Sequence, residues 1–449
     1  MYVLNSENSI FFTSDPTQMQ LSHHKIRDLF TKALSKMYQQ EVPQYQALFS
    51  LVNELNKTKL ATNSVELEDE TERHGAIRLG TAQELSMMRR LFAVMGMYPV
   101  DYYDLSVAGI PVHSTAFRAV NLALITKSPF RVFTSLLRLD LISDEALRQQ
   151  AEQILAKRQI FSDDLVALIE RSENQGALTE NEAQQFVVEA IETFRWHQNA
   201  TVEKPIYDAL NQSHRLIADI VSFKGPHINH LTPRTLDIDA VQDQMIKRGF
   251  KAKAIVEGPP LRKFPILLRQ TSFIALEEGV VFTDGKGGTH TARFGEIEQR
   301  GIALTPKGRE LYDRLLQQVK AAQGDYQTAL TDAFTEFPDD QETMRKEGLA
   351  YYQYEAETPV KDTAEKDLEQ LIANGNISVK PIIYEDFLPV SAAGIFQSNL
   401  SDAGKEAISQ SPQQTRFEQD LGAKVLDSFS LYEAIQRESL ESALKALNP

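Results

Sequence analysis

The sequence predicts an α+β fold in which two β-rich modules lie on either side of a helical block. Residues 73–81, 110–118 and 130–141 have the composition of strands, and residues 82–95 have helical periodicity. A second alternation of strands and helices covers 216–319. Because strands and helices are interspersed in both runs, we expect one mixed structure rather than an all-helical or all-β chain.

Two helices are expected before the first module. Ser22 is a candidate N-cap for the first, and Pro43 begins the second, with apolar residues at helical spacing in each. The acidic run at 66–72 is expected to be a solvated loop, with a lid over a site as the alternative. Thr81 and Glu84 then match a capping box for the helix that follows the first strand.

The later elements follow from periodicity and turn residues. Strand character returns at 216–223, after a block with helical spacing and several N-cap candidates. A short helix is expected at 239–248, and the residues of 265–303 are extended on either side of a glycine-rich turn at 284–288. Thr305 and Pro306 begin the next helix.

These patterns divide the chain into four regions of one fused catalytic body. We expect N-terminal helices and a first β-rich module in 21–142, a helical insertion in 143–215, a second β-rich module in 216–319, and a C-terminal α/β region that completes the pocket in 320–449.

Composition excludes several classes of protein. The chain has 449 residues, a formal net charge of −15 and no cysteine. The negative charge argues against a nucleic-acid partner. The lack of cysteine excludes thiolate nucleophiles, iron–sulfur clusters and thiolate zinc sites, so a metal would need His, Asp or Glu. With neither a leader pattern nor a long apolar run, a cytoplasmic protein without membrane contact is expected, and the oligomeric state is not predicted.

The stretch 73–81 is the most informative part of the chain. Side chains alternate along a strand, so His74, Ala76 and Arg78 would point to one face. One strand would then offer an imidazole and a guanidinium to the same cavity.

Strand-borne imidazoles and carboxylates make a metal site possible. Five of the nine histidines lie on or beside expected strands, namely His74, His113, His227, His230 and His290. Glu296 and Glu298 would share a strand face, where Arg300 or a metal ion could compensate their charge. Two imidazoles and one carboxylate can bind Fe(II) as a facial triad, whereas zinc more often takes three ligands and a water molecule. The residues alone do not choose between these metals.

Five long segments resemble one known family, the 2-oxoadipate dioxygenase/decarboxylases, also called hydroxyglutarate synthases. They are 73–81, 95–118, 227–239, 292–308 and 384–400, and the resemblance extends over nearly the whole chain. It implies a fold of the vicinal-oxygen-chelate type, with a curved, mostly antiparallel sheet around a metal.

The resemblance also implies a set of site residues. Its Fe(II) ligands correspond to His74, His230 and Glu298, and its substrate-carboxylate arginine to Arg78. Val390 and Ser391 correspond to residues that line the other end of the pocket. His227 and Glu296 would be near neighbours of the metal ligands.

The implied reaction converts 2-oxoadipate and dioxygen to 2-hydroxyglutarate and carbon dioxide, a step of lysine degradation. Two alternatives stay open: a zinc or manganese hydrolase or lyase acting on a small 2-oxo acid with the same ligands, and a non-catalytic protein that binds a small anion.

Overall fold

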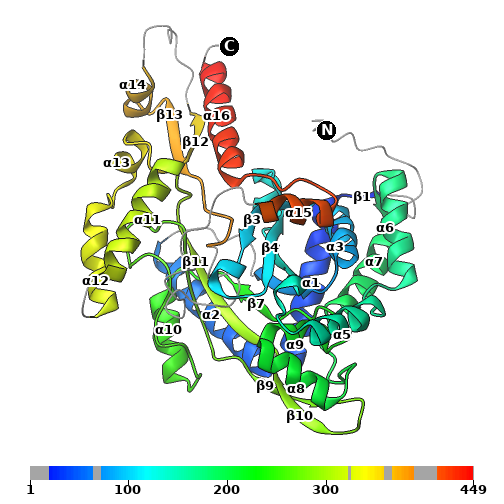
Figure 1. The fold of residues 1–449 in the computed structure, drawn as a ribbon. Helices are drawn as coiled ribbons and strands as arrows, with labels where there is room; N and C mark the ends of the chain where they lie inside the picture. The colour runs from blue at the N-terminus through cyan, green and yellow to red at the C-terminus, as the bar shows by residue number, and fades with distance from the viewer. Residues whose placement is uncertain (1–19, 64–71, 322–324, 358–366, 389–411, 448–449) are drawn as a thin grey trace.

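A curled seven-stranded sheet lies at the centre of the molecule (Figure 1). The computed structural model describes residues 20–63, 72–321, 325–357, 367–388 and 412–447. In spatial order the strands are β3 (Tyr98–Asp104), β4 (Val112–Arg118), β5 (Arg131–Leu137), β2 (Glu72–Leu79), β7 (His230–Pro233), β11 (Phe294–Arg300) and β8 (Leu268–Ser272). Four of the six neighbour pairings are antiparallel, as predicted.

Two modules of similar topology share this sheet. In the first, β2 is followed by α3 (Ala82–Val94), β3, β4 and β5, and β5 returns to lie parallel to β2. In the second, β7 is followed by α10 (Ile238–Lys247) and β8, and β11 returns to lie parallel to β7. The hairpin of β9 (Glu277–Val281) and β10 (Gly287–Thr291) projects from the second module. The antiparallel pair of β2 and β7 joins the two modules, so their first strands lie side by side.

Alternation along the strands gives the sheet one apolar face and one face on which polar side chains lie beside a smaller apolar cluster. Ile77 of β2, Leu231 of β7 and Ile297 of β11 belong to the main hydrophobic core, together with residues of α1 (His23–Glu41) and α2 (Pro43–Asn63). The intervening residues of the same strands point to the other face. That second face is the inside of the curl, where the chemically active side chains gather.

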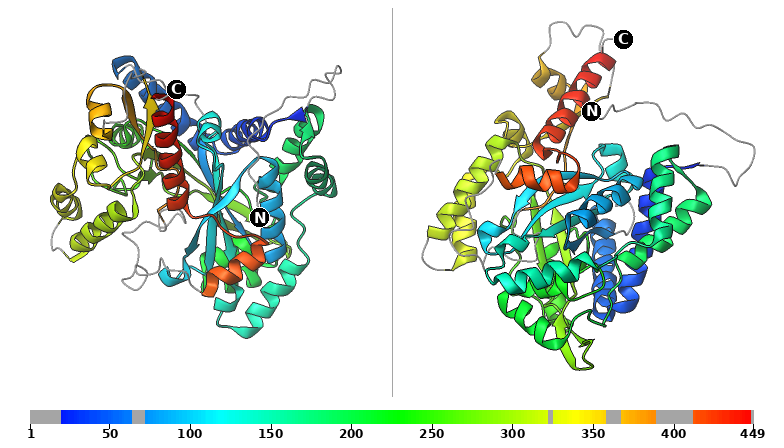
Figure 2. Two further views of the ribbon diagram at one scale, coloured as in Figure 1. Left: turned by 90° about the horizontal axis from the view of Figure 1, so that it is seen from above. Right: turned by 45° about the vertical axis from the view of Figure 1, so that its right-hand side comes forward.

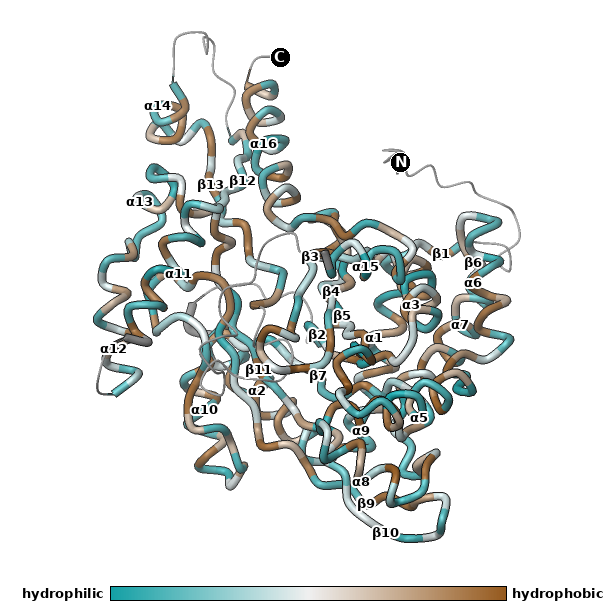
Figure 3. Tube along the Cα trace, in the orientation of Figure 1, coloured by the Kyte–Doolittle hydropathy of each residue, from teal (hydrophilic) through white to brown (hydrophobic). Residues whose placement is uncertain are grey.

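The helical block is present as predicted, but it extends further than expected. Its helices are α5 (Glu145–Ala156), α6 (Asp163–Gln175), α7 (Glu180–Thr193), α8 (Lys204–Ser213) and α9 (Arg215–Val221). Polar and apolar residues alternate along α5, α6 and α7, which accords with their position at the surface (Figure 3).

The strand prediction for 216–223 is wrong, because most of this run is helix α9. His214 caps the helix by accepting a hydrogen bond from the backbone N–H of Leu216 at 3.1 Å. Every residue of 216–221 is buried, and all of them except Asp219 are apolar. A short apolar run of this kind fits a buried strand and a buried helix equally well, and the cap decides between them.

The C-terminal region forms a second core beside the sheet (Figure 2). Its elements are α11 (Pro306–Ala321), α12 (Tyr326–Ala333), α13 (Gln341–Lys346), the hairpin of β12 (Tyr352–Ala356) and β13 (Ile377–Pro381), α14 (Leu368–Ala373) and α16 (Ser428–Leu447). Helix α15 (Pro412–Leu421) packs instead against α3 and β3 and belongs to the main core. After β13 the chain returns to the central sheet at 384–388. Among the described residues, none of the helices has the length and apolarity that a membrane crossing requires.

Candidate metal centre

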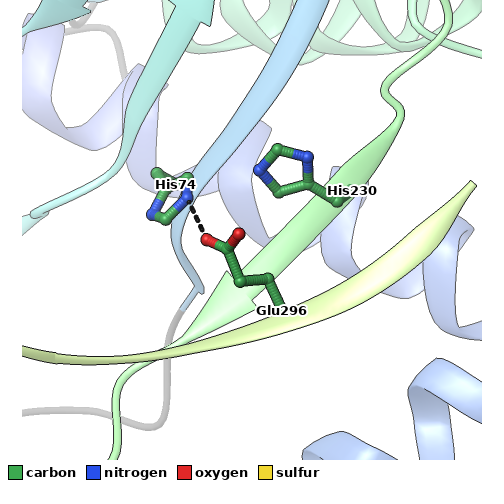
Figure 4. A group of neighbouring side chains, drawn as sticks. All are labelled: His74, His230 and Glu296. Carbon is green, nitrogen blue, oxygen red and sulfur yellow. Dashed lines mark ion pairs between the residues drawn. The ribbon is translucent and has the colours of Figure 1, made fainter. Parts of the chain in front are cut away.

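Two imidazoles meet on the inner face of the sheet, one from each module. His74 lies on β2 and His230 on β7, and the antiparallel register places Ala76 opposite His230. The two rings are 5.4 Å apart, nearly perpendicular and buried (Figure 4). The strand that was expected to carry His74 therefore brings it to a second histidine 156 positions later in the chain.

Glu296 supplies a carboxylate to this pair. Strand β11 runs parallel to β7 with Phe294 opposite His230, so Glu296 lies one pleat further along. One ligand atom each of His74, His230 and Glu296 lies within 4.8 Å of the other two (Figure 4). The Oε1 atom of Glu296 is 3.0 Å from Nε2 of His74 and also accepts a hydrogen bond from the side chain of Gln270 at 2.6 Å.

The donor set of this cluster fits a divalent metal ion. The Nδ1 atom of His230 is buried and has no hydrogen-bond partner among the described residues. A buried polar atom without a partner is costly, and a metal-bound imidazole satisfies one of its nitrogen atoms by coordination. Two imidazoles and one carboxylate are also the ligands that leave open positions on a non-haem iron.

Glu298 lies on the other side of the His74 ring from Glu296. Its Oε2 atom is 2.7 Å from Nδ1 of His74, so it contacts the ring nitrogen that faces away from Glu296. Arg300 binds both oxygens, at 2.6 and 2.9 Å, and Arg131 lies 3.4 Å away. The structure therefore brings Glu296 to the two imidazoles and gives Glu298 to two arginines.

Burial and neighbouring charges set the protonation of these groups. Burial and the adjacent His74 hold the pKa of His230 well below its usual value, so this ring is neutral and its lone pair is available. Burial opposes ionisation of Glu298, but Arg300 and His74 outweigh it and keep its pKa well below the usual range. Burial likewise opposes a charge on His74, and Glu298 and Glu296 overcome it and raise its pKa. The site is therefore built to hold anionic carboxylates beside imidazoles.

Arg78 lies on the same face of β2 as His74, as the alternation predicted. Its Nη1 atom donates to Oδ2 of Asp219 at 2.7 Å. The side chain of Arg78 borders a small pocket whose other walls include Ala76, Phe133 and Ser135. Strand β2 therefore carries a guanidinium and a candidate metal-ligating imidazole on one face, four residues apart.

The other candidate histidines have different positions. His227 is buried near the site, with its Nε2 atom 3.6 Å from Oδ1 of Asp219. The Nε2–H group of His290 donates to the same Oδ1 atom at 2.8 Å. His113 packs against Tyr102 and Phe417, away from the cluster. Asp219 therefore gathers two of the strand-borne histidines.

The sequence reasoning missed three residues of the site. Asp219 lies in the run that was predicted to be a strand, where a single acidic residue among apolar ones was the available signal. Phe387 packs edge-on against His74, with ring centroids 4.9 Å apart. Arg131 is the register partner of His74 on β5, which no local pattern reveals.

The segment that carries Phe387 is held to the sheet by buried arginines. Arg118 binds Asp386 at 2.5 and 3.0 Å, and Arg131 pairs with Glu385. Val390 and Ser391, which the resemblance assigned to the pocket, lie outside the described residues, as does the acidic run up to residue 71.

The known proteins that are similar in sequence to this chain all have the same functional name. A family model described as 2-oxoadipate dioxygenase/decarboxylase matches residues 30–399. A protein of that name from Escherichia coli is 54% identical over 433 residues, which are 92% of this chain and 97% of the relative. A protein of the same name from Pseudomonas putida is 52% identical and covers 96% of this chain and 99% of its own length.

Solved structures give the same result for the fold. A crystal structure of hydroxyglutarate synthase from Pseudomonas putida in complex with 2-oxoadipate has a TM-score of 0.89 and 52% identity, and covers 96% of this chain and 99% of its own. A glyoxalase-superfamily protein from Ralstonia eutropha has a TM-score of 0.50 at 16% identity, covering 67% of this chain and 89% of its own, which concerns the fold alone. The predicted α+β fold of vicinal-oxygen-chelate type is confirmed.

Proposed function

We propose, because this chain belongs to the 2-oxoadipate dioxygenase/decarboxylase family, that it converts 2-oxoadipate and dioxygen to 2-hydroxyglutarate and carbon dioxide with Fe(II). The atoms balance without a further co-reactant: a six-carbon 2-oxo diacid gains both oxygen atoms and loses one carbon as carbon dioxide. One oxygen atom enters the new carboxylate and the other the new hydroxyl group.

The observation that carries the proposal is the buried cluster of His74, His230 and Glu296 beside Arg78. We assign these three side chains as the Fe(II) ligands. Glu298, the ligand that the resemblance implies, is assigned instead to the far nitrogen of His74, where it accepts from the Nδ1–H group and fixes the tautomer and orientation of the ring. When bound, Fe(II) supplies the activation of dioxygen that the decarboxylation of a 2-oxo acid requires.

The remaining residues bind and orient the substrate. Arg78 is assigned to the distal carboxylate, which its planar guanidinium can bind through two parallel hydrogen bonds. Ala76 lies between His74 and Arg78 on the same face and places only a methyl group between them. Phe387 and Phe133 form an apolar wall that keeps water away from the reacting end. Val390 and Ser391 remain assigned to the opposite end of the pocket.

Gas accounting tests this function. The protein is loaded with Fe(II) without oxygen, and oxygen uptake and carbon dioxide release are then measured with 2-oxoadipate and with 2-oxoglutarate. We expect equimolar consumption and release with 2-oxoadipate and little with the shorter acid. A hydrolase, a lyase or a non-catalytic binder would consume no oxygen, and that result would overturn the proposal.

The variant His230→Ala tests the assignment of the metal ligands. It removes one imidazole from the cluster, and we expect loss of both bound iron and activity. Asn is not used here, because its amide oxygen could still bind the metal. Normal iron content in His230→Ala would contradict the ligand assignment even if oxygen uptake were lost.

A further inference from the structure

We propose that Asp219 is a positioning residue that holds Arg78 in the orientation for the distal carboxylate of the substrate, and so sets the preference for a 2-oxo diacid. This inference rests on the proposed function and adds a residue to it. Asp219 comes from helix α9, at the end of the helical block, whereas Arg78 comes from the first strand of the first module.

The contact between the two side chains uses only part of the guanidinium. Nη1 of Arg78 donates to Oδ2 of Asp219 at 2.7 Å. Among the described residues, Asp219 is the only hydrogen-bond partner of the Arg78 side chain. The guanidinium has five N–H donors, so an edge of it stays available for a carboxylate. The side chain of Arg78 is 14% exposed and borders a small pocket, so the guanidinium is not fully enclosed by protein.

Asp219 is itself fixed by a buried chain of hydrogen bonds. Its Oδ1 atom lies 2.8 Å from Nε2 of His290, and Nδ1 of His290 lies 2.8 Å from the hydroxyl group of Tyr207. The ring of Trp196 stacks on His290 with an angle of 11° between the planes. A neutral His290 that donates to Asp219 accepts from Tyr207, so one tautomer satisfies the whole chain.

The charge of Asp219 is maintained in this setting. Burial opposes its ionisation, but His227, Arg78 and His290 outweigh burial and keep its pKa well below the usual range. An anion held on one side of Arg78 limits the rotamers of a long side chain before the substrate arrives. Preorganisation of this kind reduces the ordering that binding would otherwise require.

A second reading is that Asp219 only neutralises a partly buried arginine. In that case Asp219→Asn would weaken the fold and affect every substrate alike. A positioning role predicts a selective effect, because only substrates with a distal carboxylate use Arg78. The pair 2-oxoadipate and 2-oxohexanoate separates the two readings, since they share a carbon skeleton and differ in whether the far end is a carboxylate or a methyl group.

The experiment compares Asp219→Asn with the wild-type protein. Both are loaded with Fe(II) in the absence of oxygen, and the dissociation constants of the two acids are measured by calorimetry. We expect Asp219→Asn to weaken 2-oxoadipate binding at least tenfold, to change 2-oxohexanoate binding less than threefold, and to leave iron content unchanged. With oxygen admitted, the KM for 2-oxoadipate should rise by a similar factor while kcat changes little.

Tyr207→Phe is the matched second variant, because it removes only the hydroxyl group at the far end of the chain. We expect a smaller loss, about two- to fivefold, again confined to 2-oxoadipate. If Asp219→Asn does not fold, Tyr207→Phe still allows the effect on 2-oxoadipate binding to be measured. In the double variant of Arg78→Ala with Asp219→Asn, the two effects should not add, since Asp219 acts through Arg78.

Three outcomes would overturn the inference. The first is that Asp219→Asn weakens binding of 2-oxoadipate and 2-oxohexanoate by the same factor. The second is that Asp219→Asn binds 2-oxoadipate more tightly than the wild-type protein. The third is that the effects of Asp219→Asn and Arg78→Ala on 2-oxoadipate binding add fully in the double variant. The first indicates a structural role and the second a competitor for Arg78. If the wild-type protein binds 2-oxoadipate but consumes no oxygen, the proposed function fails while the binding comparison still tests Asp219.

Discussion

Glu296 and Glu298 lie two residues apart on one strand face, and their replacement by glutamine should have opposite consequences. Glutamine keeps the shape of glutamate and removes the charge. The carboxylate of Glu296 contacts the side chains of His74, Gln270 and Thr232, and Lys253 interacts with its charge. Glu296→Gln retains an oxygen that accepts from Gln270. We therefore expect the metal-free fold to lose no more than about 1 kcal/mol.

Glu298 stands in a different environment. Its carboxylate is fully buried and compensates Arg300 and part of the charge of Arg131, both of which are also buried. Removal of one partner from a buried ion pair costs about 3–5 kcal/mol, because the other charge is left uncompensated. Arg300 also holds the backbone oxygens of Tyr384 and Asp386, so a displaced Arg300 would loosen the segment that carries Phe387.

Two measurements on each variant decide the assignment. Urea unfolding in the presence of a chelator gives the stability of the metal-free protein, and anaerobic titration with Fe(II) gives the affinity for iron. We expect Glu296→Gln to fold normally and to lose iron, and Glu298→Gln to be strongly destabilised, with a 10- to 100-fold loss of iron affinity through His74. The reasoning would be refuted if Glu298→Gln had normal stability but did not bind iron, while Glu296→Gln still bound iron.

Three further perturbations test other parts of the structure. Arg78→Lys should lower kcat/KM for 2-oxoadipate by about 10- to 100-fold, because a lysine cannot form the paired hydrogen bonds, while iron content stays normal; unchanged turnover would remove Arg78 from the substrate site. Gly75→Ala should destabilise the protein by about 1–3 kcal/mol, since the added methyl group would lie 2.6 Å from Ile228 and 3.0 Å from the backbone oxygen of His230; a fully stable variant with normal iron affinity would show that β2 and β7 can separate freely. His113 provides a pH test, because burial and Arg138 lower its pKa from 6.5 to about 3 in the folded protein. As the pH falls below 6.5, the unfolded chain binds a proton at His113 and the folded protein does not. The free energy of unfolding should therefore decrease by about 1.4 kcal/mol per pH unit in this range. In His113→Gln this loss should be absent, so between pH 6 and 4.5 its free energy of unfolding in urea should fall by about 2 kcal/mol less than that of the wild-type protein. Parallel plots of the free energy of unfolding against pH for the two proteins would contradict the lowered pKa of His113.

The sequence predicted those features that depend on neighbours in the chain. The two-residue period of 73–81 predicted the shared face of His74 and Arg78, and the structure has both on the inner face of the sheet. Half of the predicted capping box at Thr81 is present: the backbone N–H of Glu84 donates to the Thr81 hydroxyl group at 3.1 Å, but the Glu84 carboxylate accepts from the backbone N–H of Gly80 instead of Thr81. The mixed fold followed from strands and helices whose patterns were long and regular.

Features that depend on register between distant strands could not be predicted in this way. Glu296 and Glu298 have the same pattern in the sequence, and only the pairing of Phe294 with His230 distinguishes them. Arg131 becomes a neighbour of His74 because β5 returns parallel to β2, a connection made through the whole first module. For α9, burial on all sides removed the periodicity that separates helix from strand.

The arrangement explains why the C-terminal region belongs to the site rather than beside it. The inner face of the sheet carries more buried arginines than the two modules compensate by themselves. Arg118 and Arg131 find their carboxylates in Asp386 and Glu385, which arrive from the C-terminal core. Tyr432 of α16 donates to Asp386 at 2.5 Å and so ties that core to the same ion pair. The buried arginines Arg118 and Arg131 are therefore neutralised only when the segment 384–388 packs against the sheet. The same packing places Phe387 against His74, so we expect it to be coupled to formation of the metal centre.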